Sequence, residues 1–247
     1  MNLSNKGNHG DPCGVLSLFG QIHALEGRAL SLNVLLLGDW QSGRSSVGNA
    51  LIGGEEFPTG SCAPCIPMTT ECQLICRTFR HFFRRQGEES DLRLRVIDTP
   101  PLPHSLDLRD RVCELFPEGV HVLVLVVRVD WPYENVEMAA CAQILFGPEW
   151  SGHALLVLTH ADHLRKMGLN PARYLTQASD WLRSLVDMVG GRVLFLDNSS
   201  DWPVTRGKPL RDSLLSLSAS NHHTALLVKT EGSSEFDAGG VTGNIRK

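Results

Sequence analysis

The sequence predicts an α/β fold of three layers, in which a mostly parallel central sheet lies between helices on both faces. Short apolar runs typical of buried strands alternate with stretches of helical spacing along most of the 247 residues. Polar motifs, two of them with glycine or proline, follow directly after several of these runs. Ligands of parallel sheets bind at the carboxyl ends of strands, so this placement supports the fold and indicates a binding site.

The elements can be placed from apolar periodicity and from glycine and proline. We expect strands at 32–37, 73–80, 92–97, 120–127, 154–158 and 193–196. We expect helices at 45–52, 106–116, 134–146, 171–189 and 210–217, the last with an extension to 228 left open. A polar turn is expected at 84–90 and a long loop at 55–71.

One domain is expected at 31–228, after a flexible N-terminal leader at 1–30 and before a disordered tail rich in glycine and serine at 229–247. The formal net charge of −4 gives no reason to expect binding to nucleic acid or to anionic membranes. No apolar run is long enough for a transmembrane segment, and the apolar stretch near the N-terminus is too short for a signal peptide. We therefore expect a cytoplasmic protein.

Four of the seven cysteines lie close together in the sequence, at Cys62, Cys65, Cys72 and Cys76. Two such pairs could form a tetrahedral zinc site. Only six residues separate the pairs, however, and the second pair lies in a run that reads as a strand. This favours reduced thiols, and the sequence leaves the zinc alternative open.

The first motif follows the first apolar run, where residues 38–45 read Gly-Asp-Trp-Gln-Ser-Gly-Arg-Ser. This is the G-x-x-x-x-G-[K/R]-[S/T] pattern of a P-loop, whose backbone N–H groups and following helix N-terminus hold a polyphosphate. The phosphate-binding residues expected from it are Gly38, Gln41, Ser42, Gly43, Arg44, Ser45 and Ser46. The hydroxyl of Ser45 would also reach Mg²⁺.

Arg44 stands where a P-loop normally has lysine. A lysine places a compact charge between phosphates, whereas the guanidinium is longer, planar and forked, so the exchange is not conservative. This substitution reduces the expectation of tight binding and of catalysis.

The second motif is Asp98-Thr99-Pro100, after the strand that ends at Ile97. An Asp in this position can hold a water on Mg²⁺. Many nucleotide switches continue with a glycine whose N–H contacts the γ-phosphate, but this chain has Pro100 and Pro101, and proline has no N–H. No glutamine follows to orient an attacking water, so hydrolysis would be slow or would need a partner.

The third motif is Thr159-His160-Ala161-Asp162, after the strand that ends at Leu158. The carboxylate of Asp162 can accept from N1–H and the 2-amino group of guanine, donors that adenine lacks, so it would select guanine. The alternative is that Asp162 only caps a helix. A fourth and weaker motif places Asn198 after the last strand, where it can contact the purine edge.

The four motifs occur in the order that a P-loop NTPase G-domain requires, and the chain resembles one family of that class. It is similar to the immunity-associated (IMAP or AIG-type) GTPases, in the septin- and Toc-like branch, over about 32–217. The resemblance lies in the Gly-Asn pair and the aliphatic pair after the P-loop, in the Thr-Thr-Glu-Cys-Gln segment at 69–73, and in the Thr-His-Ala-Asp-His-Leu loop at 159–164.

This resemblance implies GTP or GDP with Mg²⁺ as ligands. It implies Thr69 as a switch residue that reaches the metal together with Ser45 and Asp98, with Thr70 as the alternative. It implies a guanine site of Thr159, His160, Asp162 and Asn198. It also implies nucleotide-dependent homodimers or oligomers.

Three functions stay open from the sequence. The chain could be a GTPase switch, a guanine-nucleotide-binding interaction module with little turnover, or a G-domain scaffold that no longer binds nucleotide. Arg44 and Trp40 favour the scaffold, whereas Ser45 and Asp162 are residues that a scaffold would not need.

Overall fold

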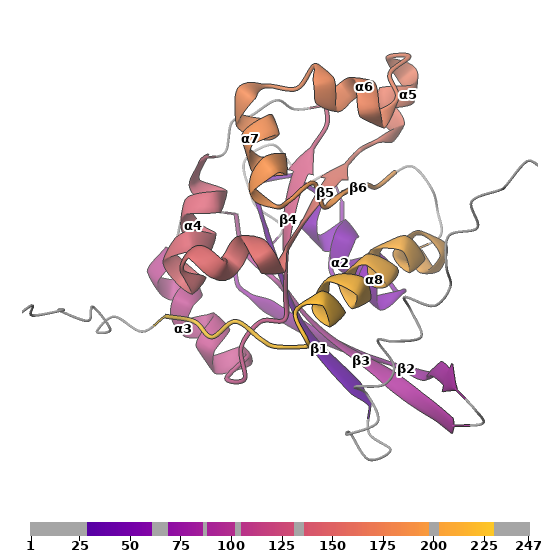
Figure 1. Cartoon of the computed structure of the whole chain (residues 1–247), viewed down its shortest axis with the longest axis vertical. Helices are drawn as coiled ribbons and strands as arrows, with labels where there is room; N and C mark the ends of the chain where they lie inside the picture. Colours follow the sequence, from indigo (N-terminus) through magenta and orange to yellow (C-terminus); the bar gives the residue numbers. More distant parts are fainter. Residues whose placement is uncertain are drawn as a thin grey trace, which may run out of the picture.

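The computed structural model describes residues 29–60, 69–85, 88–101, 105–130, 136–197 and 203–229. Their centre is a six-stranded sheet with the strand order β2-β3-β1-β4-β5-β6 (Figure 1). The strands are β1 (Leu30–Gly38), β2 (Gln73–Arg85), β3 (Glu88–Asp98), β4 (Val122–Arg128), β5 (Ala154–Thr159) and β6 (Val193–Phe195). Only the β2–β3 pair is antiparallel among the described strands, so the predicted mostly parallel sheet is confirmed.

Helices cover both faces of this sheet, which confirms the three-layer prediction (Figure 1). One face packs on α3 (Ser105–Leu115), α4 (Val136–Phe146) and α7 (Asp180–Met188). The other face packs on α2 (Arg44–Ile52) and α8 (Pro203–Ser220). Alternate residues of each inner strand enter one core or the other, and this explains why these strands are apolar without a break.

The contact between α2 and α8 leaves no room at Gly207. A Cβ atom there would lie 1.7 Å from the carbonyl oxygen of Ala50. Four residues further along α8, Nη1 of Arg211 donates to the carbonyls of Ala50 and Leu51, at 3.0 Å each. These bonds satisfy carbonyls at the end of α2 that the helix itself leaves unpaired. The helix that begins in the P-loop is thus held at its far end by α8.

The chain after α8 crosses the amino edge of the sheet. Leu226 forms an antiparallel bridge with Val120, and the N–H of Lys229 donates to the carbonyl of Leu145. His222 and His223 adopt positive φ angles of 53° and 56°, which end the helical path. The open extension of the last helix to 228 was therefore wrong.

A single helix at 171–189 was also wrong, because the structure has α6 (Pro171–Thr176) and α7 there. Ser179 lies between them with extended backbone angles, and its hydroxyl accepts from the N–H of Leu182. A serine that bonds forward in this way starts a new helix. Apolar spacing continues across this break, so the sequence predicts one helix there and not two.

The predicted polar turn at 84–90 is shorter in the structure, because β2 continues to Arg85 and β3 begins at Glu88. The two strands project beyond the rest of the sheet as a hairpin (Figure 1). A register shift lies between Phe79 and Phe83. Two short helices were not predicted, a 3-10 helix at Pro148–His153 and α5 (Asp162–Lys166).

No helix among the described residues is both long and apolar enough to cross a membrane. The predicted leader and tail lie outside the described residues, apart from residues 29, 30 and 229. The domain boundaries at 31 and 228 stay predictions.

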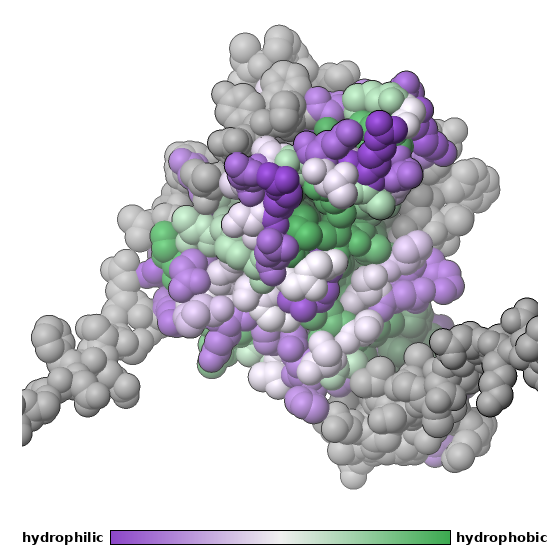
Figure 2. Space-filling model, turned by 45° about the horizontal axis from the view of Figure 1, so that its top comes forward, coloured by the Kyte–Doolittle hydropathy of each residue, from purple (hydrophilic) through white to green (hydrophobic). Residues whose placement is uncertain are grey.

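In a space-filling view, hydrophobic residues gather in the middle of one face and hydrophilic residues surround them (Figure 2).

Candidate nucleotide-binding site

Three of the four predicted motifs meet at the carboxyl edge of the sheet. The P-loop follows β1, Asp98 ends β3, and Thr159 ends β5. β3 and β1 are neighbours, and β4 alone separates β1 from β5. Since parallel strands bring their carboxyl ends to one edge, this is the place where such folds bind ligands. Asn198, the fourth motif's residue, lies outside the described residues.

The loop after β1 has the backbone shape that a phosphate site needs. Gly43 has a φ of 88° and leads directly into α2. A Cβ atom at Gly38 would lie 2.6 Å from Oγ of Ser42 and 2.7 Å from the carbonyl of Val126, so only glycine fits. The hydroxyl of Thr159 donates to the carbonyl of Ser42 over 2.6 Å and ties the loop to the third motif. The N-terminus of α2 thus opens at the loop.

Arg44 lies inside this loop, with only 6% of its surface exposed. Its Nη1 donates to the carbonyl of Gly38 and to the carbonyl of Pro100, both over 2.7 Å. Its Nε lies 3.8 Å from Oδ1 of Asp98. The guanidinium therefore bridges the P-loop and the segment after β3.

Ser45, Thr69 and Asp98, the three expected metal ligands, are in direct contact. Oδ2 of Asp98 accepts from the hydroxyl of Ser45 over 2.6 Å and from that of Thr69 over 3.2 Å. Asp98 is fully buried, and burial raises its pKa, although Arg44 and the two hydroxyls favour the charged form. A carboxylate and two hydroxyls are oxygen ligands of the kind that Mg²⁺ takes, so these residues fit the ion.

Three buried polar atoms of this site have no hydrogen-bond partner among the described residues. They are Oγ of Ser42, Nε of Arg44 and Oδ1 of Asp98. Buried polar atoms are normally paired, because an unpaired one costs about 1–3 kcal/mol. A donor or acceptor supplied by a phosphate, a metal ion or its water would satisfy them. The site therefore has the chemistry of one that takes a charged ligand.

Asp162 is the first residue of α5, and Ala161 occupies the N-cap position without a side-chain cap. The helix-cap alternative for Asp162 is therefore wrong. The carboxylate is only 8% exposed, and its Oδ2 lies 3.0 Å from Nζ of Lys166 and 3.6 Å from Nε2 of His163. Two cationic or polar groups thus hold one carboxylate oxygen.

Arg128 and Asp130 were not predicted as site residues; Arg128 is the last residue of β4, and Asp130 lies two residues beyond it. Arg128 donates to Asp130 through Nε and Nη2, over 2.9 and 2.7 Å, and to the carbonyl of Gln41 over 3.4 Å. These bonds lower the pKa of Asp130. Asp130 also lies 3.3 Å from Nδ1 of His163. A charged pair directly after a strand of uninterrupted apolar residues was the signal that could have found them.

His160 adopts a φ of 58°, a conformation that is rare for residues with a side chain. Burial lowers the pKa of its imidazole, and the nearby Arg128 adds to the shift. Its Nδ1 is 3.1 Å from the hydroxyl of Thr159. His160 is therefore held neutral beside Asp162, whereas a lysine in this place would carry a charge.

The cysteine cluster is not assembled in the described part of the chain. Cys62 and Cys65 lie outside it, and Cys72 and Cys76 are free thiols just before and within β2. Burial raises the pKa of the Cys72 thiol to about 11. No group of three or more potential ligands of the His, Cys, Asp or Glu type gathers among the described residues.

The fold and this site define a G-domain of the P-loop class. The sequence model of the AIG1 family matches residues 32–217, and the chain belongs to that family. This confirms the resemblance stated from the motifs.

Two relatives show the range of the family. Immune-associated nucleotide-binding protein 5 of Arabidopsis thaliana is 30% identical over 182 residues, which cover 68% of this chain and 54% of that protein. GTPase IMAP family member 8 of Homo sapiens is 29% identical over 217 residues, covering 82% of this chain and 30% of that protein. The chain thus spans about half or less of the length of these relatives.

Solved structures of Toc33 from Arabidopsis thaliana share the fold. A dimerization-deficient mutant superposes with a TM-score of 0.58 at 21% identity, covering 87% of this chain and 93% of that one. A complex of Toc33 with GDP and Mg²⁺ gives a TM-score of 0.52 at 22% identity, covering 87% and 94%.

Proposed function

We propose that this chain binds GTP and GDP together with Mg²⁺ through the carboxyl edge of its sheet. The observation that carries the proposal is the meeting of Ser45, Thr69 and Asp98, which come from three separate segments and share one carboxylate oxygen. A phosphate on the P-loop would lie beside this cluster. When Mg²⁺ is bound, it supplies positive charge next to the phosphates and to the buried Asp98.

Guanine would be selected by Asp162. Lys166 and His163 both lie at its Oδ2. The carboxylate is thus held in orientation while it keeps an oxygen for a base. Thr159, His160 and Asn198 complete the proposed guanine site, and Arg128 and Asp130 position it through Gln41 and His163.

We expect hydrolysis to be slow or dependent on a partner. No glutamine follows Asp98-Thr99-Pro100, and neither Pro100 nor Pro101 offers an N–H to the γ-phosphate. A second candidate function is a nucleotide-free scaffold. It is favoured by Arg44, whose guanidinium already bonds two carbonyls inside the loop.

We further propose a nucleotide-dependent homodimer through the face that carries the P-loop, where Trp40 is 38% exposed. Light scattering with and without GTP analogue tests it, and a mass that stays monomeric in both samples would exclude it.

We place the protein in the cytoplasm, a proposal supported by the free thiols Cys72, Cys76, Cys113 and Cys141. Fractionation of cells tests that placement.

The first test is an equilibrium titration with fluorescent GDP and GTP analogues in Mg²⁺, competed with ATP. We expect micromolar or tighter binding that GTP displaces and ATP does not. The control is Ser45→Ala, which removes a hydroxyl from the metal cluster and should weaken binding only when Mg²⁺ is present. Absence of binding in the native protein, together with binding by Arg44→Lys, would support the scaffold instead.

A further inference from the structure

Arg44 connects the P-loop to the segment after β3 through a guanidinium nitrogen that lies one bond further from the backbone than the ammonium of a lysine would. One nitrogen, Nη1, donates to the carbonyls of Gly38 and Pro100 at once, over 2.7 Å each. The two acceptors are separated by 62 positions in the sequence and belong to different strand ends, β1 and β3. The side chain is 6% exposed, so water does not compete strongly for these bonds.

The connection is made at a peptide group that has no N–H. In a nucleotide switch the third residue after this Asp is a glycine that senses the γ-phosphate through its backbone N–H. That place is taken here by Pro101, which has no N–H. The oxygen of the same peptide group, the carbonyl of Pro100, accepts instead from a cation that belongs to the chain itself. The sequence therefore removes the group that would respond to the γ-phosphate and adds a permanent donor in its place.

The same end of β3 is held by further bonds. The hydroxyl of Thr99 donates to the carbonyl of Leu36 on β1 over 2.9 Å, and Thr99 is fully buried. The Nε of Arg44 faces Asp98 at 3.8 Å, so the charge of Arg44 is balanced in place. Residues 98–100 thus have fixed partners in the structure without nucleotide.

We propose that Arg44 is a positioning residue that locks the segment after β3, so that this segment does not distinguish GTP from GDP. This inference rests on the proposed nucleotide site and says how that site is regulated. Any nucleotide-dependent change would then be confined to the segment that contains Thr69. Partners that recognise the segment after β3 would bind the chain in either nucleotide state.

The test is amide hydrogen exchange between Thr99 and Leu115, measured on the full chain without nucleotide, with GDP and with GMPPNP. In the native protein we expect the same exchange in all three samples and affinities for GDP and GMPPNP within about twofold. In Arg44→Lys without nucleotide, exchange should be about tenfold faster or more, because a charge-assisted hydrogen bond to Pro100 is lost. The control is Arg84→Lys, the same substitution at an exposed residue of the hairpin. It should change neither the hydrogen exchange nor the nucleotide affinities.

A second pair of variants separates the lock from folding. Pro101→Gly restores an N–H but leaves the carbonyl of Pro100 to Arg44, so this variant should still not distinguish GDP from GMPPNP. Arg44→Lys combined with Pro101→Gly should gain slower exchange with GMPPNP than with GDP. The proposal is overturned if GMPPNP slows exchange in the native protein, or if Pro101→Gly alone gains that response.

These outcomes are distinct from failure of the proposed function. If no nucleotide binds, the comparison of the native protein with Arg44→Lys in the absence of nucleotide still tests the lock. Equal exchange in those two samples overturns it.

Discussion

At the scale of single residues, we propose that Asp162 decides which base the site takes. Its carboxylate is an acceptor on both oxygens, and guanine offers two adjacent donors. Its orientation is set by Lys166 at 3.0 Å and by His163, which in turn lies 3.3 Å from Asp130. Selection of guanine would therefore depend on a carboxylate that is prepared before the base arrives.

The variant Asp162→Asn should weaken GDP binding by about 100-fold or more, because an amide places a donor against a donor of guanine. Xanthine has a carbonyl where guanine has its amino group, so xanthosine diphosphate should bind this variant better than GDP does. Competition titrations of both nucleotides check this, with the exposed Asp180→Asn as the matched control. Unchanged preference for GDP in Asp162→Asn would show that another residue reads the base.

The sequence was enough to predict which residues form the candidate site, but not the contacts between them. The motif around Asp162 is local and follows a strand, so its place at the sheet edge was predictable. The bond from Arg44 to Pro100 joins residues 56 positions apart and depends on how β1 and β3 pair. Arg128 and Asp130 were missed for the same reason, because their partners Gln41 and His163 come from other segments.

At the scale of elements, α2 carries the loop and is fixed at both sides. Asn49 in this helix acts as a backbone substitute toward Phe57. Its Nδ2 donates to the carbonyl of Phe57 and its Oδ1 accepts from the N–H of Phe57, both over 2.8 Å. Phe57 in turn packs against Gly48, where a Cβ atom would lie 2.7 Å from the ring. The chain after α2 is thereby anchored to the helix that forms the phosphate site.

Asn49→Ala should lower the free energy of unfolding by about 2–3 kcal/mol, because both backbone groups of Phe57 lose their buried partners. Asn170→Ala serves as the comparison, since it removes a single exposed bond at the N-cap of α6 and should cost about 1 kcal/mol. Urea unfolding of the two variants measures the difference. Equal losses of the free energy of unfolding in the two variants would mean that water takes over the hydrogen bonds of the Asn49 side chain without cost.

Element boundaries were predictable where the sequence changes character and not where it does not. Gly53 ends α2 in the expected place, with a φ of 69°. The break between α6 and α7 has no glycine or proline, and only the forward bond of Ser179 marks it. The β2–β3 hairpin projects beyond the helices, so no apolar partner covers its outer part and the residues there are polar. For this reason residues 84–90 were predicted as a turn although most of them belong to strands.

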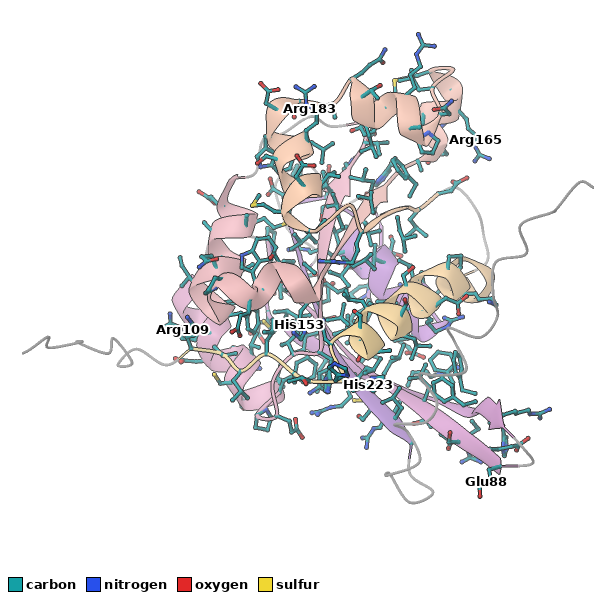
Figure 3. The ribbon with its side chains drawn as sticks, viewed as in Figure 1. Glu88, Arg109, His153, Arg165, Arg183 and His223 are labelled. Carbon is teal, nitrogen blue, oxygen red and sulfur yellow. The ribbon has the colours of Figure 1, made fainter. Side chains whose placement is uncertain are left out.

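At the scale of the whole molecule, the end of the sheet away from the nucleotide site carries a group of histidines. His121 has its Nδ1 3.0 Å from the N–H of Asn33, from which it accepts. Nδ1 of His153 lies 3.0 Å from the carbonyl of His121. Figure 3 shows His153 and His223 far from Arg165, which lies on α5 beside Asp162.

The pKa of His121 is lowered from 6.5 to about 4, mainly by burial and to a lesser degree by His223, His153 and Arg95, while Glu118 opposes the shift. Because the unfolded chain takes up this proton first, stability is complete above pH 6.5 and falls as the pH drops toward 4. Since solvent screens the site in part, we expect a loss of about 2 kcal/mol over this range.

Urea unfolding at several pH values measures this loss, and His121→Gln serves as the control because it keeps an acceptor and does not titrate. In this variant the free energy of unfolding should depend less steeply on pH between pH 6.5 and 4. An equal slope in both proteins would assign the loss to other groups.

The bridge between Leu226 and Val120 has a practical consequence for the orientation of the molecule on a surface. Val120 precedes β4, so the chain reaches Lys229 on the side of the sheet opposite to the P-loop. A sensor chip or bead coupled at position 229 would therefore hold the protein with its P-loop turned toward the solution. Immobilisation of that kind leaves the loop open to the proposed nucleotide and to the proposed second copy arriving from the bulk.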